Sequence, residues 1–155
     1  MSLMQDQQYK NILVGIDGSE TSMRALDKAV DSAKRNDAKL YIAQILKPQQ
    51  STIGQSSLGF GVVATDIDDN DRLKEQQDAI NAIVARVKSE GLDQVTAIVK
   101  VGNSREELAR NIQQEEKIDL IYIGATGVNR VAQMFLGSNS TYILENSLAY
   151  VMVVR

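Results

Sequence analysis

Five short apolar runs alternate along this chain with segments of helical periodicity, and this alternation constrains the fold more than any other feature. The runs are rich in β-branched and aliphatic residues and almost continuously hydrophobic, which is typical of strands buried on both faces of a parallel sheet. They occupy residues 12–17, 40–46, 95–101, 120–124 and 150–154. Strands that alternate with helices form right-handed βαβ units. We therefore predict an α/β fold with a doubly wound five-stranded parallel sheet, order 3-2-1-4-5, and helices on both faces.

The segments between the runs place apolar residues on one helical face, first over residues 23–33 and then over residues 73–87. A third helix is expected to begin with Ser104-Arg-Glu-Glu107, a capping-box pattern. A fourth, short helix is expected to start near Ser138 and to pack residues 143 and 144 inward.

The predicted strand order brings two chemically informative residues together. Strands one and four lie side by side where the winding direction reverses, and ligands in such folds bind outside the carboxyl ends of the strands at that reversal. Asp17 ends the first strand and Gly124 ends the fourth. Both residues are thus predicted to lie at one ligand site.

A glycine-rich run follows the fourth strand directly. Gly124-Ala125-Thr126-Gly127 is followed by nine residues and then by Gly137-Ser138. Glycine permits close approach of the backbone to a ligand, and a helix that begins after the third glycine offers free N–H groups to an anion. The run matches neither the P-loop nor the dinucleotide signature, and the same glycines could serve only as turns. The polar residues 138–141 favour a phosphate-binding loop.

Two motifs together resemble the universal stress protein family, specifically its ATP-binding branch. The first is Ile12-Leu-Val-Gly-Ile-Asp-Gly-Ser19, and the second is the spacing Gly-x2-Gly-x9-Gly-Ser that starts at Gly124. The resemblance extends from residue 9 to residue 154. It implies an ATP-binding protein that acts as a nucleotide-dependent switch or regulator in the stress response.

The resemblance also implies roles for individual residues. Asp17 would contact the ribose or, through water, a magnesium or manganese ion on the phosphates, and Ile45 would meet adenine through its backbone. Gly15 stands where some ATP-binding members have proline, and it belongs to the same nucleotide site. The triphosphate would be held by Gly124, Gly127, Gly137, Ser138, Asn139 and Ser140.

Two candidate residues have a structural alternative. Asp17 begins Asp-Gly-Ser, which is also a good turn and helix-cap sequence. Arg130 lies inside the nine-residue interval, where it would either screen phosphate charge or remain a solvated loop residue.

The composition limits the chemistry that the chain can perform. It contains no His and no Cys, which excludes a Ser-His-Asp triad, thiolate metal sites and disulfides. We assign no catalytic residue, and the enzymatic alternative is at most a slow metal-dependent ATPase. A phospho-acceptor receiver domain is disfavoured because the third strand ends over residues 100–103 without an acceptor Asp. The net charge of −3 disfavours a nucleic-acid partner.

The length of 155 residues suits one domain. We predict a polar extension over residues 1–8 and a single nucleotide-binding domain over residues 9–155, in which residues 47–66 form an unusually long variable loop. The polar start and the lack of a bilayer-spanning apolar run lead us to expect a cytoplasmic protein without a membrane partner.

The last apolar run, Tyr150–Val154, is an edge strand in the predicted order. It has no Pro or Lys to block pairing, and an open edge of this kind is an aggregation template. Members of the family that the chain resembles commonly dimerise through their last strands. We therefore expect a homodimer in which this strand pairs with its copy.

Overall fold

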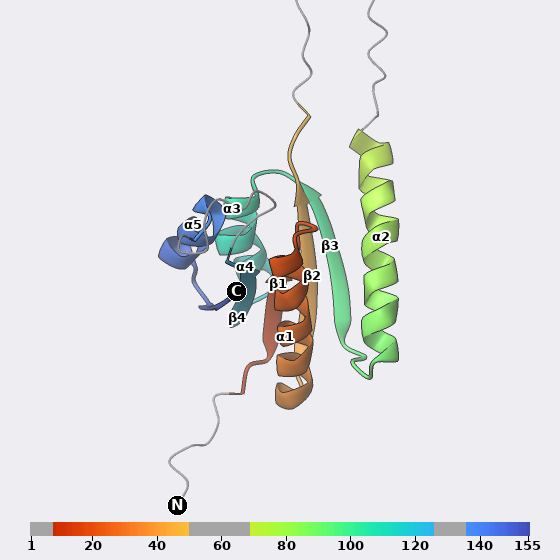
Figure 1. Cartoon of the computed structure of the whole chain (residues 1–155), viewed down its shortest axis with the longest axis vertical. Helices are drawn as coiled ribbons and strands as arrows, with labels where there is room; N and C mark the ends of the chain where they lie inside the picture. Colours follow the sequence, from red (N-terminus) through yellow and green to blue (C-terminus); the bar gives the residue numbers. More distant parts are fainter. Residues whose placement is uncertain (1–7, 50–68, 126–135) are drawn as a thin grey trace, which may run out of the picture.

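A five-stranded sheet flanked by helices forms the body of the protein (Figure 1). The computed structural model describes residues 8–49, 69–125 and 136–155. All strands pair in parallel, in the order β3-β2-β1-β4-β5. The predicted fold class and strand order are thus confirmed. The strands are β1 (Asn11–Gly15), β2 (Lys39–Leu46), β3 (Val95–Val101), β4 (Leu120–Gly124) and β5 (Tyr150–Val154).

The helices connect the strands in the expected alternation. A continuous helical stretch between β3 and β4 contains one π-helical turn, η1, between two short α-helical pieces. Among the described residues, no helix is long and apolar enough to cross a membrane. The helical elements are α1 (Glu20–Asn36), α2 (Asp69–Ser89), α3 (Ser104–Glu106), η1 (Glu107–Asn111), α4 (Ile112–Glu115) and α5 (Ser138–Asn146).

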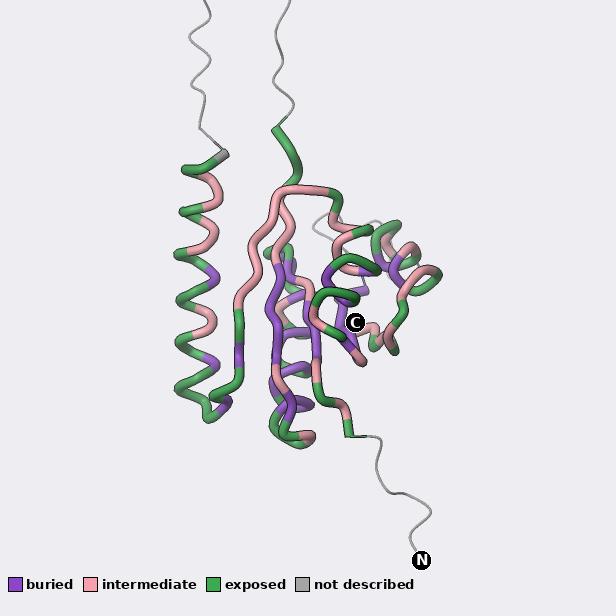
Figure 2. The backbone as a smooth tube through the Cα atoms, turned by 180° about the vertical axis from the view of Figure 1, so that it is seen from behind, coloured by how far each residue is buried: buried purple, intermediate pink, exposed green. Residues whose placement is uncertain are grey.

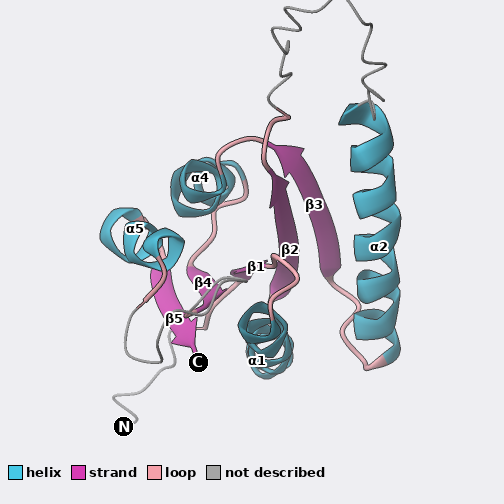
Figure 3. Cartoon of the chain, turned by 45° about the horizontal axis from the view of Figure 1, so that its top comes forward, coloured by secondary structure: helices cyan, strands magenta, loops and turns pink. Residues whose placement is uncertain are grey.

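The helices cover both faces of the sheet and create two hydrophobic clusters (Figure 3). Alternate residues of β1 point to opposite faces, so Ile12 packs with α1 and α2 while Leu13 packs with η1, α4 and α5. Figure 2 shows that the central strands are buried along most of their length, whereas α2 keeps most of its residues at least partly exposed. The core therefore lies around β1 and its two neighbouring strands.

Three local predictions need correction. Strand β1 ends at Gly15 rather than Asp17, because the Asp17 N–H donates to the Ser22 hydroxyl of α1 and the chain turns at Gly18. The cap of α3 is Asn103, whose side chain accepts a hydrogen bond from the Arg105 N–H, so the capping box does not form at residues 104–107. Leu144 is 42% exposed because it lies on the outer side of α5, while Ile143 packs inward as predicted.

Candidate functional site

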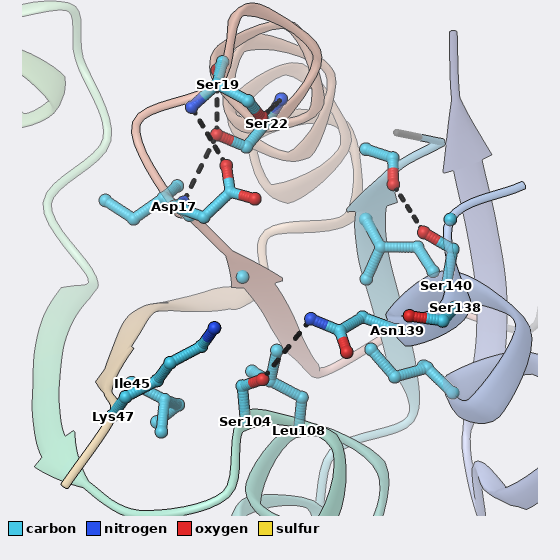
Figure 4. Close-up of a pocket in the computed structure, with 16 residues that line it drawn as sticks. Asp17, Ser19, Ser22, Ile45, Lys47, Ser104, Leu108, Ser138, Asn139 and Ser140 are labelled. Atoms are coloured by element: carbon cyan, nitrogen blue, oxygen red, sulfur yellow. Dashed lines mark hydrogen bonds between the residues drawn. The ribbon is translucent and has the colours of Figure 1, made fainter. Parts of the chain in front are cut away.

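A pocket of about 530 Å³ opens at the carboxyl ends of β1 and β4, where the starts of α1, α3 and α5 meet (Figure 4). The position is the reversal of strand order at which doubly wound folds bind ligands. Gly127 and Arg130 lie outside the described residues. The other predicted site residues all line the pocket: Gly15, Asp17, Ile45, Gly124, Gly137, Ser138, Asn139 and Ser140.

Asp17 lines the pocket and also organises the turn into α1. Its Oδ1 accepts a hydrogen bond from the Ser19 N–H at 2.9 Å, and its own N–H donates to the Ser22 hydroxyl at 3.3 Å. Gly18 adopts a φ of +81° in this turn, a conformation that favours glycine. Asp17 is exposed, and among the described residues no hydrogen bond occupies its second carboxylate oxygen. The carboxylate thus has a structural partner and a free oxygen at the pocket.

Gly124 is required by packing at the end of β4. A Cβ at this position would lie 2.7 Å from the Thr21 Oγ1 and 2.9 Å from the Ser22 backbone nitrogen. The missing side chain therefore lets β4 approach the first turn of α1, in addition to placing the backbone at the pocket. The Gly124 carbonyl accepts a 2.8 Å hydrogen bond from the buried Ser140 hydroxyl, which fixes α5 to the same strand end. Because that hydroxyl proton is engaged, Ser140 can donate to an anion only through its backbone N–H.

The three helix starts at the pocket differ in how they are capped. The Ser19 side chain caps α1 by accepting from the Ser22 N–H, and Asn103 caps α3. Gly137 precedes α5 and has no side chain to cap it. The first intrahelical bond of α5 at this end comes from Thr141 to the Gly137 carbonyl, so the N–H groups of residues 138–140 have no partner within the helix. They carry partial positive charge beside the pocket.

Part of the pocket lining is apolar. Ile45, Leu108 and Ile123 belong to it, and Leu108 comes from the π-helical turn η1. A Cβ at Gly15 would lie 2.9 Å from the Leu108 Cδ1, so this glycine leaves room for the leucine under the pocket. A pocket that combines apolar lining with a polar helix start suits a ligand with a planar apolar part and an anionic part.

Sequence reasoning missed two basic residues. Lys47 lines the pocket just past the end of β2, and its place two residues after Ile45 could have indicated this, since alternate residues of an extended chain share a face. Arg105 donates from Nε to the Asn139 Oδ1 at 2.7 Å and from Nη2 to the Ser138 Oγ at 2.9 Å. The chain crosses from β3 at the sheet edge to β4, and this crossover brings the start of α3, with Arg105, over the site. The predicted strand order already implied such a crossover.

Comparison with known proteins identifies the family. A model of the universal stress protein family matches residues 8–155. The chain belongs to the universal stress protein family. A Staphylococcus saprophyticus protein that carries the family name is 32% identical over 149 residues, which cover 95% of this chain and 84% of the relative. A Staphylococcus haemolyticus protein of the same name is 30% identical over 147 residues, covering 95% and 85%.

Solved structures of other universal stress proteins share the fold of this family member. The protein UspA from Lactobacillus plantarum matches with a TM-score of 0.77 at 24% identity, covering 97% of this chain and 100% of the other. A universal stress protein solved in complex with cAMP matches with a TM-score of 0.70 at 26% identity, covering 96% and 98%.

Proposed function

We propose that this universal stress protein belongs to the ATP-binding branch and binds ATP with magnesium or manganese in the described pocket. In this role it acts as a nucleotide-dependent switch or regulator in the stress response. The observation that carries the proposal is the start of α5. Among the described residues no side chain caps it and its first N–H groups have no partner, whereas Ser19 and Asn103 cap α1 and α3.

The phosphates would lie at this helix start. Ser138, Asn139 and Ser140 supply backbone N–H groups there, and an anion at a helix N-terminus is stabilised by both the hydrogen bonds and the helix dipole. Lys47 lines the same pocket and adds positive charge. The glycine-rich segment 124–127 enters the pocket at Gly124, and its continuation through Gly127 and Arg130 stays a prediction.

The nucleoside would occupy the apolar side of the pocket. Ile45 lies near the end of β2, where it is half-buried and lines the cavity. The relative solved with cAMP supports an adenine nucleotide as the class of ligand, because it shares the fold over nearly the whole chain.

The donor set fits a metal ion that reaches the site together with the phosphates. Among the described residues, no group of three or more carboxylates could hold a metal by itself. Magnesium usually binds through one or two carboxylates together with substrate phosphates, and Asp17 offers one carboxylate oxygen at the pocket. Asp17 would thus hold such an ion, directly or through water, and the ion would neutralise phosphate charge.

We further propose that the protein is a homodimer formed through β5. This strand pairs with β4 on one side and is the last strand of the sheet. Leu148, Tyr150 and Met152 on and beside it are 64%, 60% and 47% exposed. Pairing with a second copy would cover these apolar side chains and the open strand edge.

Replacing Ser138 with Asp tests where the phosphates bind. A carboxylate in the first turn is favourable to α5, and Arg105 can donate to it as it does to the Ser138 hydroxyl, so the fold should be retained. The same carboxylate repels a phosphate group. Two like charges about 4 Å apart repel by about 4 kcal/mol at an effective dielectric constant of about 20. Salt and solvent screen part of this repulsion, so we expect a loss of ATP affinity of at least about tenfold.

Calorimetry with magnesium and ATP measures this loss. Gln94→Glu is the matched control, because it adds the same charge at an exposed position beyond the opposite end of the sheet. It should bind ATP as the unmodified protein does. ATP binding by Ser138→Asp with unchanged affinity would exclude the α5 start as the phosphate site, and no ATP binding by the unmodified protein would refute the proposed function.

A further inference from the structure

Arg105 joins the start of α3 to the start of α5 through two hydrogen bonds from one guanidinium group. Its Nε lies 2.7 Å from the Asn139 Oδ1, and its Nη2 lies 2.9 Å from the Ser138 Oγ. We propose that Arg105 is a positioning residue that holds Ser138 and Asn139 as hydrogen-bond donors to the phosphate chain of the ligand. This inference rests on the proposed function and adds to it a residue outside the lining of the pocket.

The three side chains differ in what they can donate and accept. A serine hydroxyl and an asparagine amide can each act as donor or acceptor, whereas a guanidinium group only donates. Arg105 therefore uses the acceptor oxygens of both partners. The Ser138 hydroxyl proton and the Asn139 Nδ2 amino group are left to point elsewhere. Within the described part of the chain, the Asn139 Nδ2 makes one long contact of 3.5 Å, to the Ser104 Oγ.

The same contacts prevent the opposite orientation. If the Asn139 amide turned over, its amino group would face the Arg105 Nε–H, and two donors would oppose each other. If the Ser138 hydroxyl turned, it would give up a charge-assisted hydrogen bond. Both side chains are consequently fixed in the state that suits an anion, before the anion arrives.

Charge gives a second reason to connect Arg105 with an anion. Among the described residues, no carboxylate lies within ion-pair distance of its guanidinium group, whereas Arg24 pairs with Glu20 and Arg86 pairs with Asp27. Arg105 is half-buried beside the start of α5, where a positive charge is unfavourable to the helix dipole. A phosphate group bound at this helix start would balance the charge of Arg105 and also offset its unfavourable interaction with the helix dipole.

A merely structural clamp between α3 and α5 is the competing explanation, and the chain offers a matched control for it. Arg110 in η1 also reaches α5, where its Nη2 donates to the Asn146 Oδ1 at 3.3 Å. Ser138 and Asn146 are the two ends of α5, about 12 Å apart at 1.5 Å per residue. Arg110→Gln therefore removes one positive charge and one bridge to α5 at the end away from the pocket.

The experiment measures calorimetric affinities for three probes: ATP with magnesium, inorganic tripolyphosphate, and adenosine. Arg105→Gln should weaken ATP and tripolyphosphate binding about tenfold and change adenosine binding by less than about twofold, since only the phosphates meet the affected donors. Arg105→Lys keeps the charge but cannot bond both partners in the same planar geometry, so it should recover little of the loss. Arg110→Gln should bind all three probes as the unmodified protein does.

Three results would overturn the inference: unchanged phosphate affinity in Arg105→Gln, full recovery in Arg105→Lys, or an equal loss for adenosine. The proposed function fails separately, if the unmodified protein binds no ATP. Tripolyphosphate binding then decides the role of Arg105. The role is supported if Arg105→Gln binds tripolyphosphate more weakly than the unmodified protein, and it is refuted if the unmodified protein binds no tripolyphosphate.

Discussion

Replacing Gly124 with Ala should destabilise the fold, and the structure indicates why. The new Cβ would lie 2.7 Å from the Thr21 Oγ1, 2.9 Å from the Ser22 nitrogen and 2.9 Å from the Thr21 carbonyl carbon. Two of these atoms belong to the backbone of α1, so no side-chain rotation removes the contacts. Thr21 and Ser22 are themselves buried, at 5% and 3% exposure, so the first turn of α1 must shift within a packed interior.

The expected cost follows from overpacking. Inserting a methyl group into a well-packed interior destabilises proteins by about 1 to 3 kcal/mol. For a domain of this size, 1 kcal/mol corresponds to about 2 to 4 °C in Tm, so we expect Tm to fall by roughly 2 to 12 °C. Chemical denaturation followed by far-ultraviolet circular dichroism measures the free energy of unfolding directly.

Gly102→Ala is the control for the general effect of adding a methyl group to glycine. A Cβ at position 102 would meet the Glu107 side chain at 3.8 Å, which is an ordinary van der Waals contact. Reduced freedom of the unfolded chain affects both variants alike. If Gly124→Ala proved as stable as Gly102→Ala, the packing explanation for Gly124 would be refuted.

Two further predictions concern assembly and pH dependence. Met152→Lys should convert the proposed dimer to a monomer of 17.1 kDa in light scattering at micromolar concentration while changing Tm little, because Met152 is 47% exposed. A lysine at Val153 in the same strand would test the dimer less cleanly, since Val153 packs against the core. A monomeric unmodified protein would contradict the dimer. Lys100 donates to Glu115 at 2.9 Å, and this hydrogen bond raises the lysine pKa above its ordinary value of 10.5 despite partial burial, with Glu107 adding to the effect. A lysine whose pKa is raised in the folded state stabilises the protein at pH values below its unfolded-state pKa. Lys100→Gln should therefore lower the unfolding free energy by up to about 1 kcal/mol at neutral pH, and the stability difference between the two proteins should disappear as pH rises through the raised pKa. A stability difference that persisted at that pH would contradict its origin in the Lys100 charge.

The fold could be predicted from the sequence because its signals are redundant. Each strand is marked by a continuous apolar run, each connecting segment has helical period, and the handedness of βαβ units leaves few topologies. Local caps were harder to place. Asn103 and Ser104 are both good cap residues, and only the backbone conformation at Asn103, with φ −88° and ψ 111°, decides between them.

The candidate site was predictable where the backbone determines the location. Asp17, Gly124 and the start of α5 follow from the strand order. The use of individual side chains was not predictable, since it depends on distances across the pocket. Ser140 donates to a carbonyl 16 residues earlier in the chain, and Arg105 reaches α5 across more than 30 residues. Such contacts leave no local pattern in the sequence.

Amide nuclear magnetic resonance of the isotope-labelled protein, titrated with magnesium and ATP, tests directly whether the start of α5 holds the phosphates. We expect the N–H signals of Ser138, Asn139 and Ser140 to shift most strongly, because phosphate oxygens accept their hydrogen bonds. Signals near Asp17 and Ile45 should shift with them. Saturation with ATP that leaves the α5 amides unchanged would contradict the claim that this helix start holds the phosphates.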